Sequence, residues 1–445
     1  MLTKRENESK YKRQEITYIS LEEMVPTDHL VRKIDGVMDW KWIYEKVEHL
    51  YSENTGRPSV DPIILVKISM LQLIFGIDSM RQTISEIQTN MAYRWFLGYG
   101  LHDPIPHHST VGKNFIHRFE ENKVAEDIFA YVLNQCIDNG LVENHTYFID
   151  STHVKASANK HKLEEKEVTI PPKVYQEVLE AHVEETRENH GKRPLKKKEI
   201  KETQVKKVSK TDPDSGMFYK NEKERCLAYS LHAACDCHGF VVGVEVTGAN
   251  VHDSVILGPL LNRSIMNAGK PDAIAADAGY KTPYIAKLLF DENIRPVLPY
   301  TRPKTKDGFF KKYEYVYDEY YDVYICPEGQ LLKYSTTDRD GYSHYKSNPR
   351  ECKSCLSRNQ CTQSQTMQKS VTRHVFAEYL EEAEHLRHTP ENKMIYKARK
   401  ETIERVFADL KEKQGLRYTR LRGIRNLKRQ ALLAFACHNL RKHAK

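Results

Sequence analysis

The chain has 445 residues, of which 40% are hydrophobic, 10% aromatic and 29% charged. That composition supports a packed interior and excludes wholesale disorder, and the length allows about two or three domains. The longest apolar stretch, residues 62–77, is interrupted by Lys67 and is shorter than the roughly 20 residues of a membrane span. Because the N-terminus also lacks the apolar segment of a secretory signal, we expect a cytoplasmic protein with no membrane partner.

The first 140 residues predict a helical domain. Apolar residues recur at helical spacing over 62–77 and again over 79–97. A loop containing two prolines follows, and Ser109 is placed to cap the N-terminus of the next helix. The helical pattern continues over 129–136.

Residues 145–150 read as a short buried strand that ends in Asp150. The segment 155–225 then changes in character, because 32 of its 71 residues are charged. A helix is indicated over 175–187. The rest of the segment, notably 193–210, is typical of a solvated insertion.

Residues 226–300 alternate between strand and helix signals. In chain order, the pattern predicts a hairpin of strands 227–236 and 240–246, a helix 252–261, a strand 273–276, a helix 282–291 and a strand 294–298. This order favours a mixed α/β sheet with flanking helices. A second insertion, 301–395, is rich in Tyr, Lys, Asp and Cys, and single helices are expected over 394–413 and 426–440.

Two carboxylates, Asp150 and Asp277, directly follow short apolar strands. Side chains at the carboxyl ends of strands point into the crevice where α/β sheets bind ligands. Taken singly, however, an Asp at a strand end is more often a turn or capping residue. Both interpretations stay open on this pattern alone.

A third carboxylate, Glu404, lies on the predicted helix 394–413. A helical projection places Glu404 in line with Lys400 and Lys411, at the edge of a core-facing apolar stripe. This arrangement could direct the carboxylate toward a sheet edge and the lysines toward phosphates. An ordinary surface ion pair is the alternative.

Basic residues are concentrated at the C-terminus. Residues 396–445 contain 15 Lys/Arg and 4 Asp/Glu, a surplus of 11, whereas the whole chain carries a formal net charge of +8. Such a region indicates a polyanionic partner, most often nucleic acid, or else a solvated charged face.

Four of the nine cysteines form a cluster in the second insertion: Cys326, Cys352, Cys355 and Cys361. Four thiolates are the ligand number of a closed tetrahedral Zn²⁺ site, and the Cys352–Cys355 spacing is a good half-site. A structural zinc ion and reduced free thiols are the two interpretations. The group Cys226, Cys235 and Cys237 is expected to serve in packing.

Several motifs, in order along nearly the whole chain, resemble the DDE transposases of bacterial insertion sequences. They include GRPSVDPIILVKISMLQLIFGI, DPIPHHSTVGKNF, YFIDSTHVKASANK, SKTDPDSG, VTGANVHDS, AIAADAGYKT and YKARKETIERVFADLKEKQGLRYTRLRG, with CPEGQLL and CKSC in the second insertion. The resemblance implies an α/β fold with an RNase H-like mixed sheet. An all-α DNA-binding domain (1–140) would precede the catalytic domain (141–300 and 396–445), which would carry the charged insertion 155–225 and the cysteine insertion 301–395.

The resemblance implies that Asp150, Asp277 and Glu404 form the catalytic triad and bind two Mg²⁺ or Mn²⁺ ions. It places the family's Tyr, Arg, Glu and Lys of the last motif at Tyr396, Arg399, Glu404 and Lys411. The expected phosphate contacts are Tyr396, Arg399, Lys400, Lys411, Arg417, Arg420, Arg422 and Arg425.

The implied partners are double-stranded DNA, as terminal inverted repeats and target, and a second copy of the chain. The implied location is the bacterial cytoplasm, at the nucleoid. Two alternatives remain at this stage. One is an RNase H-like nuclease that cuts without joining, and the other is a domesticated DNA-binding regulator; the intact acidic triad counts against the second.

Overall fold

The computed structural model describes residues 16–52, 58–114, 118–119, 123–169, 175–196, 203–219, 225–302 and 305–445. The chain divides into two compact units. The first unit comprises Met1–Leu141, Ala408–Arg417 and Arg429–Lys445, and the second unit comprises Val142–Phe407 and Tyr418–Lys428. Within the described residues, no helix combines the length and apolar character that a membrane crossing requires.

The N-terminal part of the first unit is helical, as predicted. Its helices are α2 (Leu21–Met24), α3 (Leu30–Val37), α4 (Trp42–Val47), α5 (Pro62–Ile74), α6 (Met80–Thr89), α7 (Met91–Leu97), α8 (His108–Asn114) and α9 (Val124–Asp138). The continuous helical spacing over 79–97 does not correspond to one helix, because Asn90 separates α6 from α7. The Asn90 side chain accepts the backbone N–H groups of Ala92 and Tyr93 and thereby caps α7.

Lys67 interrupts the apolar sequence of α5, yet its side chain is buried. Its ammonium group donates to Asp35 Oδ1 at 2.7 Å and to the carbonyl oxygen of Phe96 at 2.9 Å. It also lies 4.6 Å from the ring centroids of both Trp40 and Phe96. The lysine is therefore a satisfied internal cation of the helical region.

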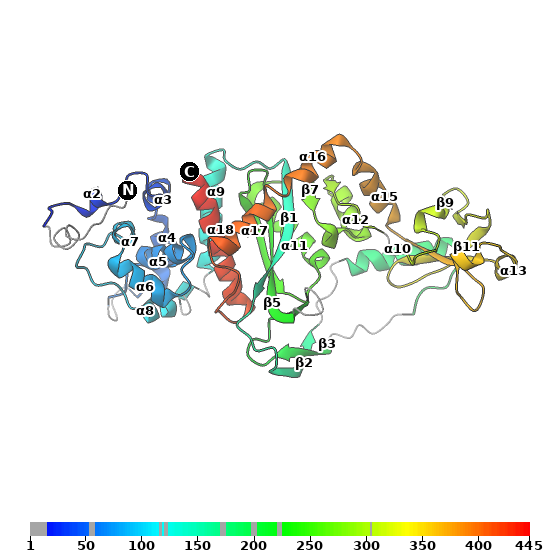
Figure 1. Cartoon of the computed structure of the whole chain (residues 1–445), viewed down its shortest axis with the longest axis horizontal. Helices are drawn as coiled ribbons and strands as arrows, with labels where there is room; N and C mark the ends of the chain where they lie inside the picture. Colours follow the sequence, from blue (N-terminus) through cyan, green and yellow to red (C-terminus); the bar gives the residue numbers. More distant parts are fainter. Residues whose placement is uncertain are drawn as a thin grey trace, which may run out of the picture. The chain divides into compact units, whose positions relative to one another are not determined.

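The core of the second unit is a six-stranded mixed sheet (Figure 1). Its strands are β1 (Thr146–Lys155), β4 (Gly216–Tyr219), β5 (Arg225–Cys235), β6 (Val241–Gly248), β7 (Ala273–Ala276) and β8 (Arg295–Val297). β6, β5 and β1 are successively antiparallel, and β1, β7 and β8 are successively parallel. The helices α11 (Asp253–Ala268) and α12 (Pro283–Asp291) form the crossovers that parallel strands require. This is the mixed sheet expected from the sequence.

The charged insertion holds more regular structure than the sequence indicated. β2 (Leu163–Thr169) and β3 (Thr203–Ser209) form a two-stranded antiparallel sheet, and α10 (Gln176–Asn189) lies between them in sequence. The prediction that residues 193–210 form a solvated segment missed β3. The Lys-rich sequence of this strand lacks the apolar alternation of a half-buried strand. Residues 170–174, 197–202 and 220–224 of this insertion lie outside the described residues.

The second insertion is a five-stranded antiparallel sheet with short helices, a fold that the sequence analysis did not foresee. Its strands are β9 (Val316–Asp318), β10 (Val323–Ile325), β11 (Leu331–Thr337), β12 (Tyr342–Ser347) and β13 (Ser370–His374), and its helices are α13 (Pro349–Lys353), α14 (Arg358–Cys361) and α15 (Ala377–Leu386). Tyrosines dominate its core. Helix α10 of the charged insertion lies alongside β11 (Figure 1), where Arg187 donates to Thr336 and Thr337.

Three helices complete the chain: α16 (Pro390–Ala398), α17 (Ile403–Glu412) and α18 (Ile424–His443). The prediction of a single helix over 394–413 was wrong, since the helix is interrupted between Ala398 and Ile403. Thr402 bonds back to the carbonyl oxygens of Ala398 and Arg399 at this break. The apolar stripe predicted for this region is buried: Ile403, Val406, Phe407 and Leu410.

We expect Gly76→Ala to lower the free energy of unfolding by about 2–4 kcal/mol, because the added Cβ strains the left-handed backbone conformation and also clashes with neighbouring backbone. Gly76 has φ +62°, and a Cβ there would lie 2.6 Å from the carbonyl oxygen of Lys413. The control is Gly98→Ala, where φ is +74° but no described atom lies within 4 Å of the added Cβ. Denaturant unfolding followed by circular dichroism should show the larger loss for Gly76→Ala; equal losses would contradict the clash.

Candidate active site

Asp150 and Asp277 occupy equivalent positions on neighbouring strands. In the parallel pairing of β1 with β7, Ile149 lies opposite Ala276, and each carboxylate is the next residue along its strand. β7 ends there, but β1 continues to Lys155, because its later residues stay paired with β5. Asp150 is thus inside its strand, whereas the sequence placed it at the end.

A third carboxylate, Asp253, joins these two from the first turn of α11. A Cβ added to Gly279 would lie 3.1 Å from Asp253 Oδ2 and 3.2 Å from Asp277 Oδ1, so the two carboxylates flank this glycine. Asp277 Oδ1 also accepts the Gly279 N–H at 2.9 Å, and Asp253 is hydrogen-bonded to the side chain of Ser151. From the sequence, Asp253 was expected either to support the site, as was His252, or to cap the following helix. The cap is instead His252, whose Nδ1 accepts the Ser254 N–H.

Buried polar groups support Asp253 from within the sheet. His232 on β5 is fully buried, and its Nδ1 lies 3.5 Å from Asp253 Oδ1 and 3.4 Å from the Tyr280 hydroxyl. Its Nε2 pairs with Thr247 Oγ1 at 2.9 Å. Burial lowers the pKa of His232 to about 4, so the imidazole is neutral at pH 7. The sequence signal for this network was a histidine inside the mostly apolar strand β5.

The pKa values of Asp150 and Asp253 are both raised. Burial raises the pKa of Asp150 to about 6, and the charges of Asp277 and Asp253 add to the effect. Arg399 opposes it, because its Nη2 donates to Asp150 Oδ2 at 2.9 Å. Burial also raises the pKa of Asp253, with Asp277 adding to the rise. The site therefore concentrates negative charge in a partly dehydrated place, which favours a bound cation.

Glu404 is exposed on α17 and lines a pocket of about 530 Å³. The same pocket is lined by Tyr396, Arg399 and Lys400. Arg399 also donates to the Tyr396 hydroxyl at 3.3 Å, so it connects this pocket to Asp150. The structure thus gathers Glu404 with three of the predicted DNA-binding residues. The predicted alignment of Lys400 with Glu404 on one helix was wrong, since Lys400 precedes α17; the two side chains share the pocket instead.

The remaining predicted phosphate contacts are spread over both units. Lys411 lies on α17, and Arg417 is ion-paired with Glu412; both basic residues belong to the first unit. In the second unit, Arg420 and Arg425 are exposed. Arg422 there donates to the carbonyl oxygen of Ser157 at 3.2 Å.

The four cysteines of the second insertion line one small cavity of about 30 Å³. The turn between β10 and β11 directs the Gln330 N–H to Cys326 Sγ at 3.3 Å, and Cys361 Sγ lies 3.2 Å from the Tyr315 hydroxyl. All nine cysteines of the chain are free thiols. Among the described residues, no three of the four sulfur atoms lie within 4.8 Å of one another, so a shared ion would require the cysteine side chains to move.

Two family models match the chain. Residues 19–117 match the Transposase domain (DUF772), and residues 325–444 match the Transposase DDE domain. No curated protein and no solved structure matches it. With the mixed sheet and its carboxylates, these matches define the class: an RNase H-like, DNA-cleaving enzyme of a kind that generally uses divalent metal ions. Both matched models are transposase domains, and together they support an insertion-sequence DDE transposase, a class that acts on DNA.

Gly279→Ala should displace the carboxylates of Asp253 and Asp277 by a few tenths of an ångström. We expect a loss of metal-dependent DNA cleavage on the order of 10- to 100-fold, because small misplacements of reacting groups are costly. Gly258→Ala is the matched control, since its Cβ would meet only Leu288 Cδ2, at 3.9 Å. Both variants are compared with the parent in a cleavage assay and by thermal unfolding. Undiminished cleavage by Gly279→Ala would refute the importance of this spacing.

Proposed function

We propose that this transposase binds the terminal inverted repeats of its element and catalyses metal-dependent DNA cleavage and strand transfer. The observation that carries the proposal is the parallel pairing that sets Asp150 beside Asp277, with Asp253 facing Asp277 across Gly279. The helical region 1–140 would bind the repeats. Two copies of the chain would hold the two ends of the element.

The donor set fits two Mg²⁺ or Mn²⁺ ions, because these hard cations prefer carboxylate oxygens. Asp150, Asp253 and Asp277 would supply oxygens to two ions about 3.5–4 Å apart. Such ions activate the attacking oxygen and stabilise the leaving oxygen of a phosphodiester.

The protein side chains would orient the carboxylates and the DNA. Arg399 holds Asp150 through its 2.9 Å contact and brings positive charge to the pocket that Glu404 lines. Tyr396 and Lys400 line this pocket and would contact the scissile-strand phosphates, with Lys411, Arg417, Arg420, Arg422 and Arg425 adding contacts elsewhere on the duplex. Phosphate contacts of this kind position DNA without reading its sequence.

Two residues are candidates for the third carboxylate of the triad. The resemblance assigns it to Glu404, whereas Asp253 is the residue whose contacts already adjoin Asp277. We propose that both contribute, with Glu404 entering when DNA fills the pocket. His232 would keep Asp253 in place through its neutral imidazole.

A cleavage assay on a plasmid carrying the element ends tests the proposal. We expect Asp150→Asn, Asp277→Asn and Glu404→Gln each to reduce Mg²⁺-dependent cleavage at the repeat ends by at least about 10³-fold, with Asp253→Asn similar or slightly milder. Glu401→Gln, an exposed neighbour on the turn before α17, is the control and should retain activity.

The outcomes separate the alternatives. Cleavage without joined products indicates a nuclease, and repeat binding without cleavage by the parent protein indicates a DNA-binding regulator. Cleavage that survives all three triad substitutions would show that the active site lies elsewhere.

The cysteine insertion would hold a structural Zn²⁺ ion through Cys326, Cys352, Cys355 and Cys361, because all four thiols line one cavity. We expect about one equivalent of zinc per chain after extensive dialysis, lost together with insertion stability in Cys352→Ser/Cys355→Ser. Cys226→Ser is the control. Less than a small fraction of an equivalent in the parent protein would favour free thiols.

A further inference from the structure

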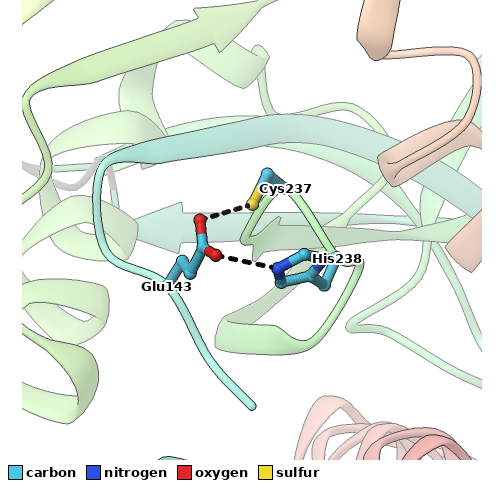
Figure 2. A group of neighbouring side chains, drawn as sticks. All are labelled: Glu143, Cys237 and His238. Atoms are coloured by element: carbon cyan, nitrogen blue, oxygen red, sulfur yellow. Dashed lines mark hydrogen bonds and ion pairs between the residues drawn. The ribbon is translucent and has the colours of Figure 1, made fainter. Parts of the chain in front are cut away.

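A second cluster of metal-ligating side chains lies away from Asp150, where the chain enters β1. Glu143 precedes the strand, and Cys237 and His238 belong to the turn between β5 and β6 (Figure 2). One ligand atom from each residue lies within 4.8 Å of the other two, and the described residues hold no other such group of three His, Cys, Asp or Glu side chains. The prediction that Cys237 serves in packing was wrong, because this cysteine is exposed in the turn.

The Glu143 carboxylate lies between the thiol and the imidazole (Figure 2). Cys237 Sγ–H donates to Glu143 Oε2 at 3.2 Å, and His238 Nε2 lies 3.0 Å from Oε1. Although the residue is exposed, partial burial of its thiol raises the pKa of Cys237 to about 12, with the Glu143 hydrogen bond and the nearby acidic charges adding to the rise. Three different donors, sulfur, nitrogen and oxygen, are thus already in contact.

One buried carboxylate fixes the backbone of this cluster. Asp236 Oδ2 accepts the Glu143 N–H at 3.0 Å, and its Oδ1 accepts the N–H groups of His238 at 3.0 Å and Phe240 at 2.7 Å. Gly239 completes the tight turn with φ +78°. The backbone around the three ligand residues is therefore fixed before any ion binds, and such preorganisation is what a metal site requires.

We propose that Glu143, Cys237 and His238 bind a divalent ion of the zinc type. A thiolate, an imidazole and a carboxylate suit this borderline-soft cation, and three protein ligands leave one coordination position for water. On binding, the thiol proton is released to solvent and the sulfur–metal bond replaces it. In the metal-free site the Nε2 proton faces Glu143 Oε1, so the neutral imidazole binds the ion through Nε2 after that proton has passed, through solvent, to Nδ1. Both His238 and Glu143 are about half exposed, so an ion can enter.

The bound ion would tie the segment before β1 to the β5–β6 turn. These are the ends of two paired strands, since Phe148 lies opposite Cys235. The site would therefore stabilise the sheet that carries Asp150 without contacting the carboxylates of the candidate active site. If no ion binds here, the proposed transposition chemistry is unaffected.

Cobalt titration of the full-length, metal-depleted chain tests this site. Because the insertion cysteines are also proposed to bind a metal ion, the measured quantity is the difference in bound equivalents and in thiolate-to-cobalt absorption between parent and variant. Cys237→Ser and His238→Ala should each bind one equivalent fewer. Cys226→Ser, a half-buried thiol on β5, and His145→Ala, an exposed neighbour paired with Asp272, should match the parent.

A second measurement guards against variants that fail to fold. Zinc should raise the unfolding temperature of Cys352→Ser/Cys355→Ser, and Glu143→Gln added to that background should abolish the rise. Unchanged cobalt stoichiometry in Cys237→Ser, or a zinc response that survives Glu143→Gln, would overturn the proposal.

Discussion

The parallel pairing of β1 with β7 is the constraint on which the rest of the candidate site depends. It puts Asp150 and Asp277, which are far apart in the chain, next to one another at the place where β7 ends. β5 holds β1 from the other side and supplies His232 beneath the site. The crossover helix α11 then brings in Asp253 at its first turn, because its N-terminus lies at the same end of the sheet.

This arrangement balances charges in a partly buried environment. Several carboxylates close together are unfavourable unless cations or hydrogen-bond donors offset them. Arg399, Ser151 and the Gly279 N–H supply part of that compensation. His232 contributes no charge, because burial keeps it neutral, so the remaining negative charge is available to metal ions.

Segments that looked like spacers also have structural roles. In the SKTDPDSG motif, Asp212 is buried and accepts the Tyr229 hydroxyl and the Gly423 N–H. Asp214 accepts the Ile424 N–H at the start of α18. The motif therefore anchors the basic segment before α18 beside the end of β1, where Thr419 also bonds Lys155. The charged insertion likewise supplies α10, whose Arg187 secures the cysteine insertion.

Periodicity and residue type in the sequence determined the hairpin β5–β6, the strand β7, the helices around it and the buried stripe of α17. These elements depend on local patterns of burial, which a sequence displays directly. The sequence also identified the family through its ordered motifs. It missed β3 and the tyrosine-rich sheet, whose strands do not alternate cleanly, and the break between α16 and α17.

Tertiary structure alone decided which side chains meet. Asp253, His232 and Tyr280 become neighbours of the two strand carboxylates only through strand pairing and crossover geometry. Glu143 and Cys237 are 94 residues apart in the sequence and meet only because the strands beside them are paired. The sequence named Glu404 and Arg399 but not their common pocket or the Arg399–Asp150 contact. Local propensity follows from each residue's own backbone and neighbours, whereas a site is made by long-range pairing that no local pattern encodes.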